Sequence, residues 1–128
     1  MKQHKDILIK NLKEKSNAAL DDAKLAIDND RLDTAHNRIY YAIFYIVAAL
    51  GYKQDFVTSK HAQLLGWFIK NFIKENIFDI EMGEIYKKAY ENRMKSDYEF
   101  TYKPDKEKVV DLFNKSKKFI ITVQDYVS

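Results

Sequence analysis

Apolar side chains recur every three or four residues through almost the whole of this chain, and few residues interrupt the pattern. That spacing places apolar side chains along one face of an α-helix. The 128 residues include only 3 Gly and 1 Pro, too few for the many tight turns that a sandwich or barrel of short strands needs. The sequence therefore predicts an all-α fold and disfavours an all-β one.

The apolar stripes divide the chain into segments, and short connections between them favour antiparallel neighbours. We therefore predict an antiparallel up-and-down bundle of about five helices, in one domain over residues 1–128. Gly51 is expected to end the second helix, and Thr58 or Ser59 to cap the third. The predicted helices cover residues 5–28, a start within 30–33 to 51, 58 or 59 to 75–76, 79 or 81 to about 97, and 104 to the C-terminus.

The stripes also predict which side chains form the core. With 46% hydrophobic residues, the chain can bury a core of ordinary size. The side chains expected to be buried are Ile43, Val47, Leu65, Phe68, Phe72, Leu112 and Ile120.

Several classes of protein are excluded by composition. The absence of Cys removes disulfides, zinc ribbons, iron–sulfur clusters and thiol nucleophiles. His4, His36 and His61 lack metal-ligand spacing, so we expect neither a metal nor a cofactor. A catalytic serine elbow, a Gly-rich phosphate loop and an HExxH motif are also missing. No signal-peptide core precedes residue 10 and no apolar run approaches the ~20 residues of a membrane span, so we expect a cytoplasmic protein without membrane association.

The charge pattern directs attention to arginine. The net charge of +3 gives little support for nucleic-acid binding, and the Lys-rich helix faces are typical of solvated surface. Only Arg31, Arg38 and Arg93 are arginines. An arginine on an apolar helix face is therefore informative.

Arg93 and Asp97 lie four residues apart on a helix face that is apolar in its preceding turns. One interpretation is a surface ion pair, which contributes only ~0.5 kcal/mol. The other is a phosphate-binding guanidinium that Asp97 orients, flanked by Tyr86, Tyr90 and Tyr98 for base stacking.

A second set of candidates lies on two other predicted helices. Arg38, Tyr41 and Tyr45 share one stripe, either as a polar aromatic surface or as core tyrosines with paired hydroxyls. His61 lies at the start of the third helix, on the face of Leu65. It is either a structural histidine, or a base or ligand.

Three motifs in this order resemble the HEPN domain family. They are Ala35-His36-Asn37-Arg38-Ile39-Tyr40-Tyr41-Ala42-Ile43-Phe44, then Ser59-Lys60-His61, then Ala89-Tyr90-Glu91-Asn92-Arg93-Met94-Lys95-Ser96-Asp97-Tyr98. The resemblance covers nearly the whole chain, and the signatures YYAxF and RxxxDY make it fairly specific. It is closest to the small stand-alone prokaryotic branch, similar to the helical C-terminal domain of kanamycin nucleotidyltransferase.

The resemblance implies a homodimer with a nucleotide or RNA groove near its interface, lined by the Arg at position 93, and a separate minimal nucleotidyltransferase as partner. Nuclease members of the family carry a His shortly after that Arg, where this chain has Tyr98, Glu99 and Phe100. Phe100 also replaces the Tyr that a partner nucleotidyltransferase adenylylates in some family toxins.

The expected function is a non-catalytic nucleotide- or RNA-binding module that acts with a nucleotidyltransferase, in the setting of a toxin–antitoxin pair. The binding candidates are Arg93, Asp97, Tyr98, Arg38, Tyr41 and His61. The alternative is a metal-independent endoribonuclease toxin in which His61 or Asp97 replaces the missing family His. A third interpretation is a structural subunit whose Arg93–Asp97 pair only stabilises the bundle.

Overall fold

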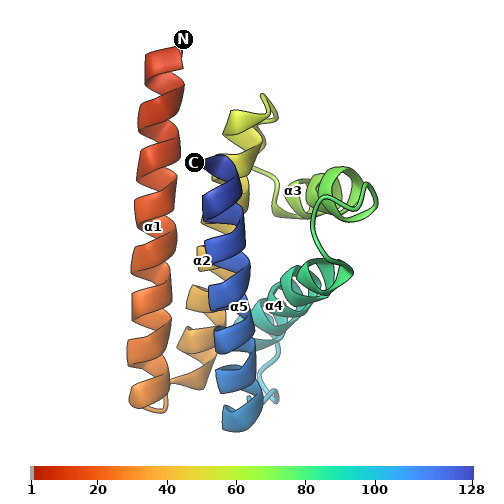
Figure 1. The fold of residues 1–128 in the computed structure, drawn as a ribbon. Coiled ribbons are helices and arrows are strands. Elements are labelled where there is room, and N and C mark those ends of the chain that lie inside the picture. Colours follow the sequence, from red (N-terminus) through yellow and green to blue (C-terminus); the bar gives the residue numbers. More distant parts are fainter. Residues whose placement is uncertain (1) are drawn as a thin grey trace.

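The structure is a computed structural model, and it describes residues 2–128. All regular elements in that range are helical, which confirms the predicted all-α fold class. They are α1 (Lys2–Asp28), α2 (Leu32–Lys53), α3 (His61–Phe68), the π-helical segment η1 (Ile69–Ile73), α4 (Ile80–Tyr98) and α5 (Lys106–Val127). In Figure 1, α1, α2 and α5 run along one another, with α1 antiparallel to the other two. Helix α4 is inclined to them, and α3 lies to one side of them.

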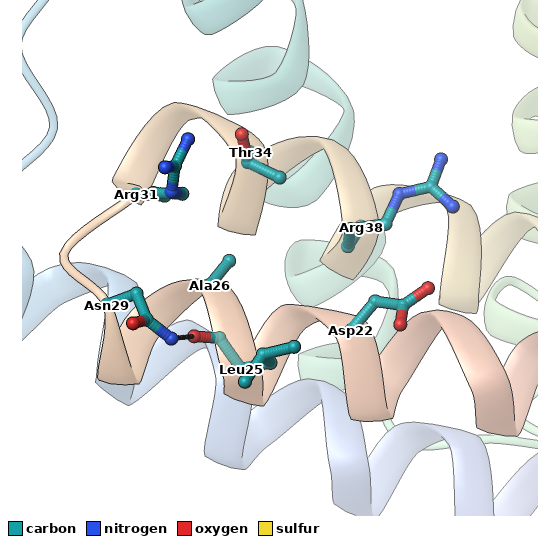
Figure 2. A pocket seen from close by; sticks show the side chains of 7 residues that line it. All are labelled: Asp22, Leu25, Ala26, Asn29, Arg31, Thr34 and Arg38. Atoms are coloured by element: carbon teal, nitrogen blue, oxygen red, sulfur yellow. Dashed lines mark hydrogen bonds between the residues drawn. The ribbon is translucent and has the colours of Figure 1, made fainter.

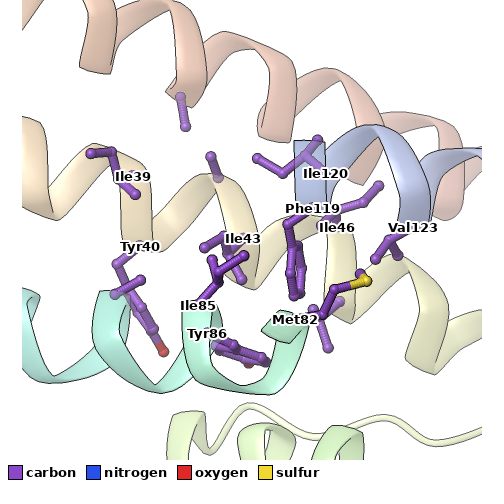
Figure 3. Close-up of a cluster of buried hydrophobic side chains, with 14 of the residues drawn as sticks. Ile39, Tyr40, Ile43, Ile46, Met82, Ile85, Tyr86, Phe119, Ile120 and Val123 are labelled. Atoms are coloured by element: carbon purple, nitrogen blue, oxygen red, sulfur yellow. The ribbon is translucent and has the colours of Figure 1, made fainter. Parts of the chain in front are cut away.

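Helix α2 is the centre of the bundle, because it contacts α1, α3, α4 and α5. Its face made of Ile39, Ile43 and Ile46 is fully buried. Figure 3 shows these side chains directed toward α4 and toward α5, where Phe119, Ile120 and Val123 lie. The long buried face of α2 therefore provides the surface on which the other helices pack.

The predicted core residues are buried in the structure with one exception. Leu65 is only half-buried, and its neighbour Leu64 occupies the core at 1% exposure. Leu64, Phe68 and Phe72 follow one another at four-residue steps, the last of them inside η1. Because η1 has more residues per turn than an α-helix, counting two regular turns back from Phe72 gives Leu65, whereas one turn back from Phe68 gives the buried Leu64.

The predicted end of the second helix was wrong. Helix α2 continues through Gly51 to Lys53, and the positive φ that ends it is at Asp55. Gly51 is instead required by a close approach, because a Cβ there would lie 2.5 Å from the backbone oxygen of Phe56.

The start of α3 also differs from the prediction. Its N-cap is Lys60, without a side-chain capping bond, so neither Thr58 nor Ser59 caps the helix. Thr58 Oγ1 instead accepts a hydrogen bond from the Lys60 backbone N–H at 3.1 Å. Asp79, one of the two predicted starts of the fourth helix, is the N-cap of α4. Over residues 2–128, no helix combines the length and apolarity needed to cross a membrane.

Candidate functional site

The Arg93–Asp97 pair lies where the buried face of α4 reaches the surface. Tyr86 and Ala89 of the same face are buried, whereas the side chains of Arg93 and Asp97 retain 16% and 26% exposure. Arg93 Nε is 2.8 Å from Asp97 Oδ2, yet its N–H is not directed at an acceptor. The contact is therefore an ion pair without hydrogen-bond geometry, in a partly buried position.

Three aromatic rings surround the Arg93 guanidinium. Its central carbon is 5.7 Å from the ring centroid of Tyr40, 5.4 Å from that of Tyr41 and 5.8 Å from that of Tyr98. Arg93 also donates a long hydrogen bond of 3.4 Å to the Tyr41 hydroxyl. These rings hold the guanidinium in place by cation–π attraction.

The predicted flanking tyrosines were only partly right. Tyr98 does flank Arg93, but Tyr90 packs edge-on against Tyr40 at 5.7 Å between centroids. Tyr86 is fully buried against Phe68. Tyr86 precedes Arg93 by two helical turns and so faces the core, while rings from α2 complete the surroundings of Arg93.

Arg38 joins the same cluster from α2. Its guanidinium carbon lies 5.2 Å from the Tyr41 centroid, so the Tyr41 ring neighbours both Arg38 and Arg93. Asn37 connects the two charged groups: its Oδ1 accepts bonds from Arg38 Nε and Nη2 at 3.0 and 2.8 Å. Its Nδ2 donates to Asp97 Oδ2 at 3.3 Å.

His61 forms the other edge of the cluster. Its Nδ1 is hydrogen-bonded to the Tyr40 hydroxyl at 2.8 Å, and its ring stacks on Phe44 at 4.2 Å between centroids. Burial, with a smaller contribution from the positive charge of Arg93, lowers the pKa of His61 below 6.5. The imidazole is therefore neutral at neutral pH.

The electrostatics of the cluster favour an anion. Arg38 and Arg93 bring two positive charges, and among the described side chains in direct contact with them Asp97 is the one carboxylate. Burial raises the pKa of the Tyr40 hydroxyl, so it keeps its proton and can donate or accept a hydrogen bond. A phosphate at the Arg93 guanidinium would lie beside the exposed ring of Tyr98.

The structure brings the six binding candidates together in one cluster; that they bind a ligand stays a prediction. They are Arg38, Tyr41, His61, Arg93, Asp97 and Tyr98. Sequence reasoning missed Asn37, Tyr40 and Phe44, which connect the candidates to one another. Their signal was helical spacing: Asn37 is four residues before Tyr41, and Tyr40 four before Phe44.

None of the three surface cavities described next is lined by Arg93. Cavities of about 560 and 860 Å³ lie between α4 and α5. A third, of about 380 Å³, lies between α1 and α2 and includes Arg38 in its lining (Figure 2). Within the described residues, no group of three His, Cys, Asp or Glu side chains is placed to hold a metal ion.

The chain is similar to known proteins over most of its length. The model of the HEPN domain family matches residues 9–126. A Thermotoga maritima protein named "UPF0332 protein" is 34% identical over 123 residues, which cover 96% of this chain and 93% of that protein.

Two further relatives come from Methanocaldococcus jannaschii. "Putative toxin MJ0142" is 33% identical over 119 residues, covering 93% of this chain and 81% of that protein. "Putative toxin MJ0605" is 32% identical over 98 residues, covering 77% of this chain and 72% of that protein.

Proposed function

The chain belongs to the HEPN domain family, and from that premise we propose that it is a non-catalytic module that binds a nucleotide or RNA. The observation that carries the proposal is the Arg93 guanidinium, held by Asp97 and by the rings of Tyr40, Tyr41 and Tyr98. A guanidinium fork suits a phosphate, and an aromatic ring beside it suits a base.

The proposed roles follow from exposure and contacts. Arg93 contacts phosphate through its terminal nitrogens, since its Nε faces Asp97. Asp97 and Tyr41 orient that guanidinium, and Arg38 adds the second positive charge. Tyr98 is 63% exposed and offers the ring on which a base can stack.

The proposal includes a protein partner and a second copy of the chain. Met94, Tyr98 and Phe100 are exposed at the end of α4, with Phe100 fully exposed. Exposed aromatic and Met side chains are enriched in protein interfaces. We expect Met94 and Phe100 to contribute to a homodimer interface, with a minimal nucleotidyltransferase as the separate partner in a toxin–antitoxin pair.

Fluorescence anisotropy with a labelled single-stranded oligoribonucleotide tests the binding function. The Arg93→Ala variant should lose most of the affinity, and Arg93→Lys should recover only part of it, because an ammonium keeps the charge but not the fork. Lys118→Ala, which removes an exposed positive charge on α5, is the matched control. Equal affinities for wild type and a folded Arg93→Ala protein would refute the site and favour a purely structural pair.

The partner is tested by genome context and co-purification. A nucleotidyltransferase reading frame beside this gene, whose product co-purifies with the chain, is the expected result. A folded chain that fails to bind the product of such a neighbour would contradict this part of the proposal.

A second candidate function is a metal-independent endoribonuclease, favoured by the position of His61 in the same cluster as Arg93. When Nδ1–H donates to the Tyr40 oxygen, Nε2 keeps a lone pair and can take the proton of an RNA 2′-hydroxyl. The 2′-oxygen then attacks phosphorus, the bond to the 5′-oxygen breaks, and that oxygen takes a proton from water.

RNA cleavage in EDTA distinguishes the two candidates. Cleavage that is lost in both His61→Gln and Arg93→Ala would establish the nuclease. RNA binding without cleavage by the wild-type chain would establish the non-catalytic module.

A further inference from the structure

The arginines of this chain are few, and the structure places all of them on one continuous strip. Arg93 and Arg38 both lie against the Tyr41 ring, at 5.4 and 5.2 Å from its centroid. Arg38 and Arg31 both line the cavity between α1 and α2. Arg38 therefore links the Arg93 cluster to that cavity, and no lysine lines the cavity.

The α1–α2 cavity has a volume of about 380 Å³ and a polar wall along α2. Figure 2 shows Arg31 and Thr34 in the first turn of this wall, Arg38 one turn further on, and Asp22 of α1 opposite Arg38. Arg31 and Thr34 are exposed.

The positive charges of this cavity are not neutralised by ion pairs. Among the described residues, neither Arg31 nor Arg38 has a carboxylate within ion-pair distance, and Arg38 donates only to the neutral Asn37 amide. Asp22 lines the same cavity and is paired to neither guanidinium, so the two arginines leave the lining with a net positive charge. Two uncompensated guanidiniums and a hydroxyl form a lining suited to phosphate oxygens.

We propose that this cavity binds a further phosphate of the strand that Arg93 contacts, so that the ligand class is a single-stranded oligonucleotide and not a mononucleotide. The inference rests on the proposed function and extends it from one phosphate position to several. The backbone passes from Arg93 across Arg38 to Arg31, along the surface of α2. A ligand with one phosphate reaches Arg93 but leaves the cavity empty.

The kind of cation favours nucleic acid over a membrane surface. Anionic lipid surfaces attract Lys and Arg alike through charge, whereas phosphate groups held at fixed positions favour the planar guanidinium. This chain is rich in Lys, and yet its arginines alone make the strip.

The test measures affinity as a function of oligonucleotide length and salt. Fluorescence anisotropy is recorded for labelled oligoribonucleotides of increasing length and, by competition, for adenosine monophosphate. Wild-type affinity should rise with length. Arg31→Ala should weaken binding of the long strands several-fold, leave adenosine monophosphate binding unchanged, and reduce the slope of log affinity against log salt by about 0.7. Arg31 is an exposed side chain, so its removal should not unfold the protein.

The controls separate this inference from the proposed function. Lys118→Ala removes one exposed charge far from the strip and should leave the affinity and the salt slope close to wild type. If Arg31→Ala matches Lys118→Ala while Arg93→Ala still abolishes binding, the cavity proposal is overturned and the proposed function stands. Failure of the wild type to bind any strand overturns both. Retention on phosphatidylserine vesicles without length-dependent RNA binding would replace the inference by a membrane surface.

Discussion

The two sides of α2 carry neighbouring stripes with opposite properties. Ile39, Ile43 and Ile46 are fully buried against α4 and α5. On the neighbouring stripe of the same helix, Arg38 and Tyr41 are half-buried, and the Tyr41 ring lies against both Arg38 and Arg93. The isoleucine side packs through apolar contacts, and the side with Arg38 and Tyr41 places charges and hydroxyls at the edge of the bundle.

This difference indicates that one side of α2 stabilises the fold and the other positions polar side chains. Partly burying a guanidinium costs free energy unless its charge is compensated. Asp97 and three aromatic rings stabilise the charge of Arg93. A fully solvated arginine needs no such contacts, because water stabilises its charge. The bundle therefore supports a polar cluster whose arrangement is fixed before any ligand arrives.

The largest effect on stability is expected from the apolar side. Ile43→Ala should lower the free energy of unfolding by about 2–5 kcal/mol, because Ile43 is fully buried and its removal leaves a cavity. Urea denaturation measures this change. Ile121→Ala, at a 49% exposed position on α5, should change stability by no more than about 0.5 kcal/mol. A small loss for Ile43→Ala would contradict the assignment of this side as the core.

An intermediate effect is expected from the polar side. Arg93→Ala should cost between the ~1 kcal/mol of an exposed ion pair and the ~3–5 kcal/mol of a broken buried pair, because Arg93 retains 16% exposure. The matched control is Lys24→Ala, which breaks an exposed pair with Asp28 at the same spacing and should cost less than about 0.5 kcal/mol. Equal losses of unfolding free energy in both variants would mean that the rings around Arg93 do not contribute to stability.

A change of pH tests His36 of α2 and His61 at the start of α3. Burial lowers the pKa of His36, against the opposing effect of Asp33, and burial also lowers that of His61. As the pH falls through 6.5, the unfolded chain takes up protons before the folded chain does, so the free energy of unfolding should decrease. Urea melts at pH 7.5 and 5.5 measure this decrease, which His36→Gln should reduce. Stability that rises toward acid pH would contradict the lowered pKa values.

The smallest effect on stability is expected at Tyr98, which is 63% exposed. Tyr98→Ala should change the free energy of unfolding by no more than about 0.5 kcal/mol. It should nevertheless weaken oligoribonucleotide binding by about 1–3 kcal/mol, the contribution of one stacked base. Ile80→Ala, at a position of similar exposure, should leave binding unchanged. Unchanged binding in Tyr98→Ala would remove the stacking role.

Helical periodicity predicted the fold because each stripe is a local property of its own segment. It failed where the backbone departs from regular α-helix. Regular spacing counted back across the π-helical η1 predicted Leu65 as the core residue, whereas Leu64 is the buried one. It also failed at Gly51, whose need for glycine comes from the backbone of Phe56 in the following loop.

The candidate site was predictable only in part. Arg93 and Asp97 are visible as a pair because they share one helix. The Arg93–Tyr41 contact joins residues 52 apart, and the Asn37–Asp97 bond joins residues 60 apart. Such contacts depend on how α2 and α4 pack together, which spacing within either helix does not specify.

The central claim, that this arginine cluster binds the phosphates of an RNA strand, can be observed directly by nuclear magnetic resonance. The chain has three arginines and one Trp, so the side-chain N–H spectrum contains three Arg Nε signals and one Trp67 indole signal. On titration with a single-stranded oligoribonucleotide, the Arg93 and Arg38 signals should shift together and in a saturable way. Trp67, which stacks on Phe56 away from the cluster, should not shift. Unshifted Arg93 and Arg38 signals while other resonances report binding would contradict the claim.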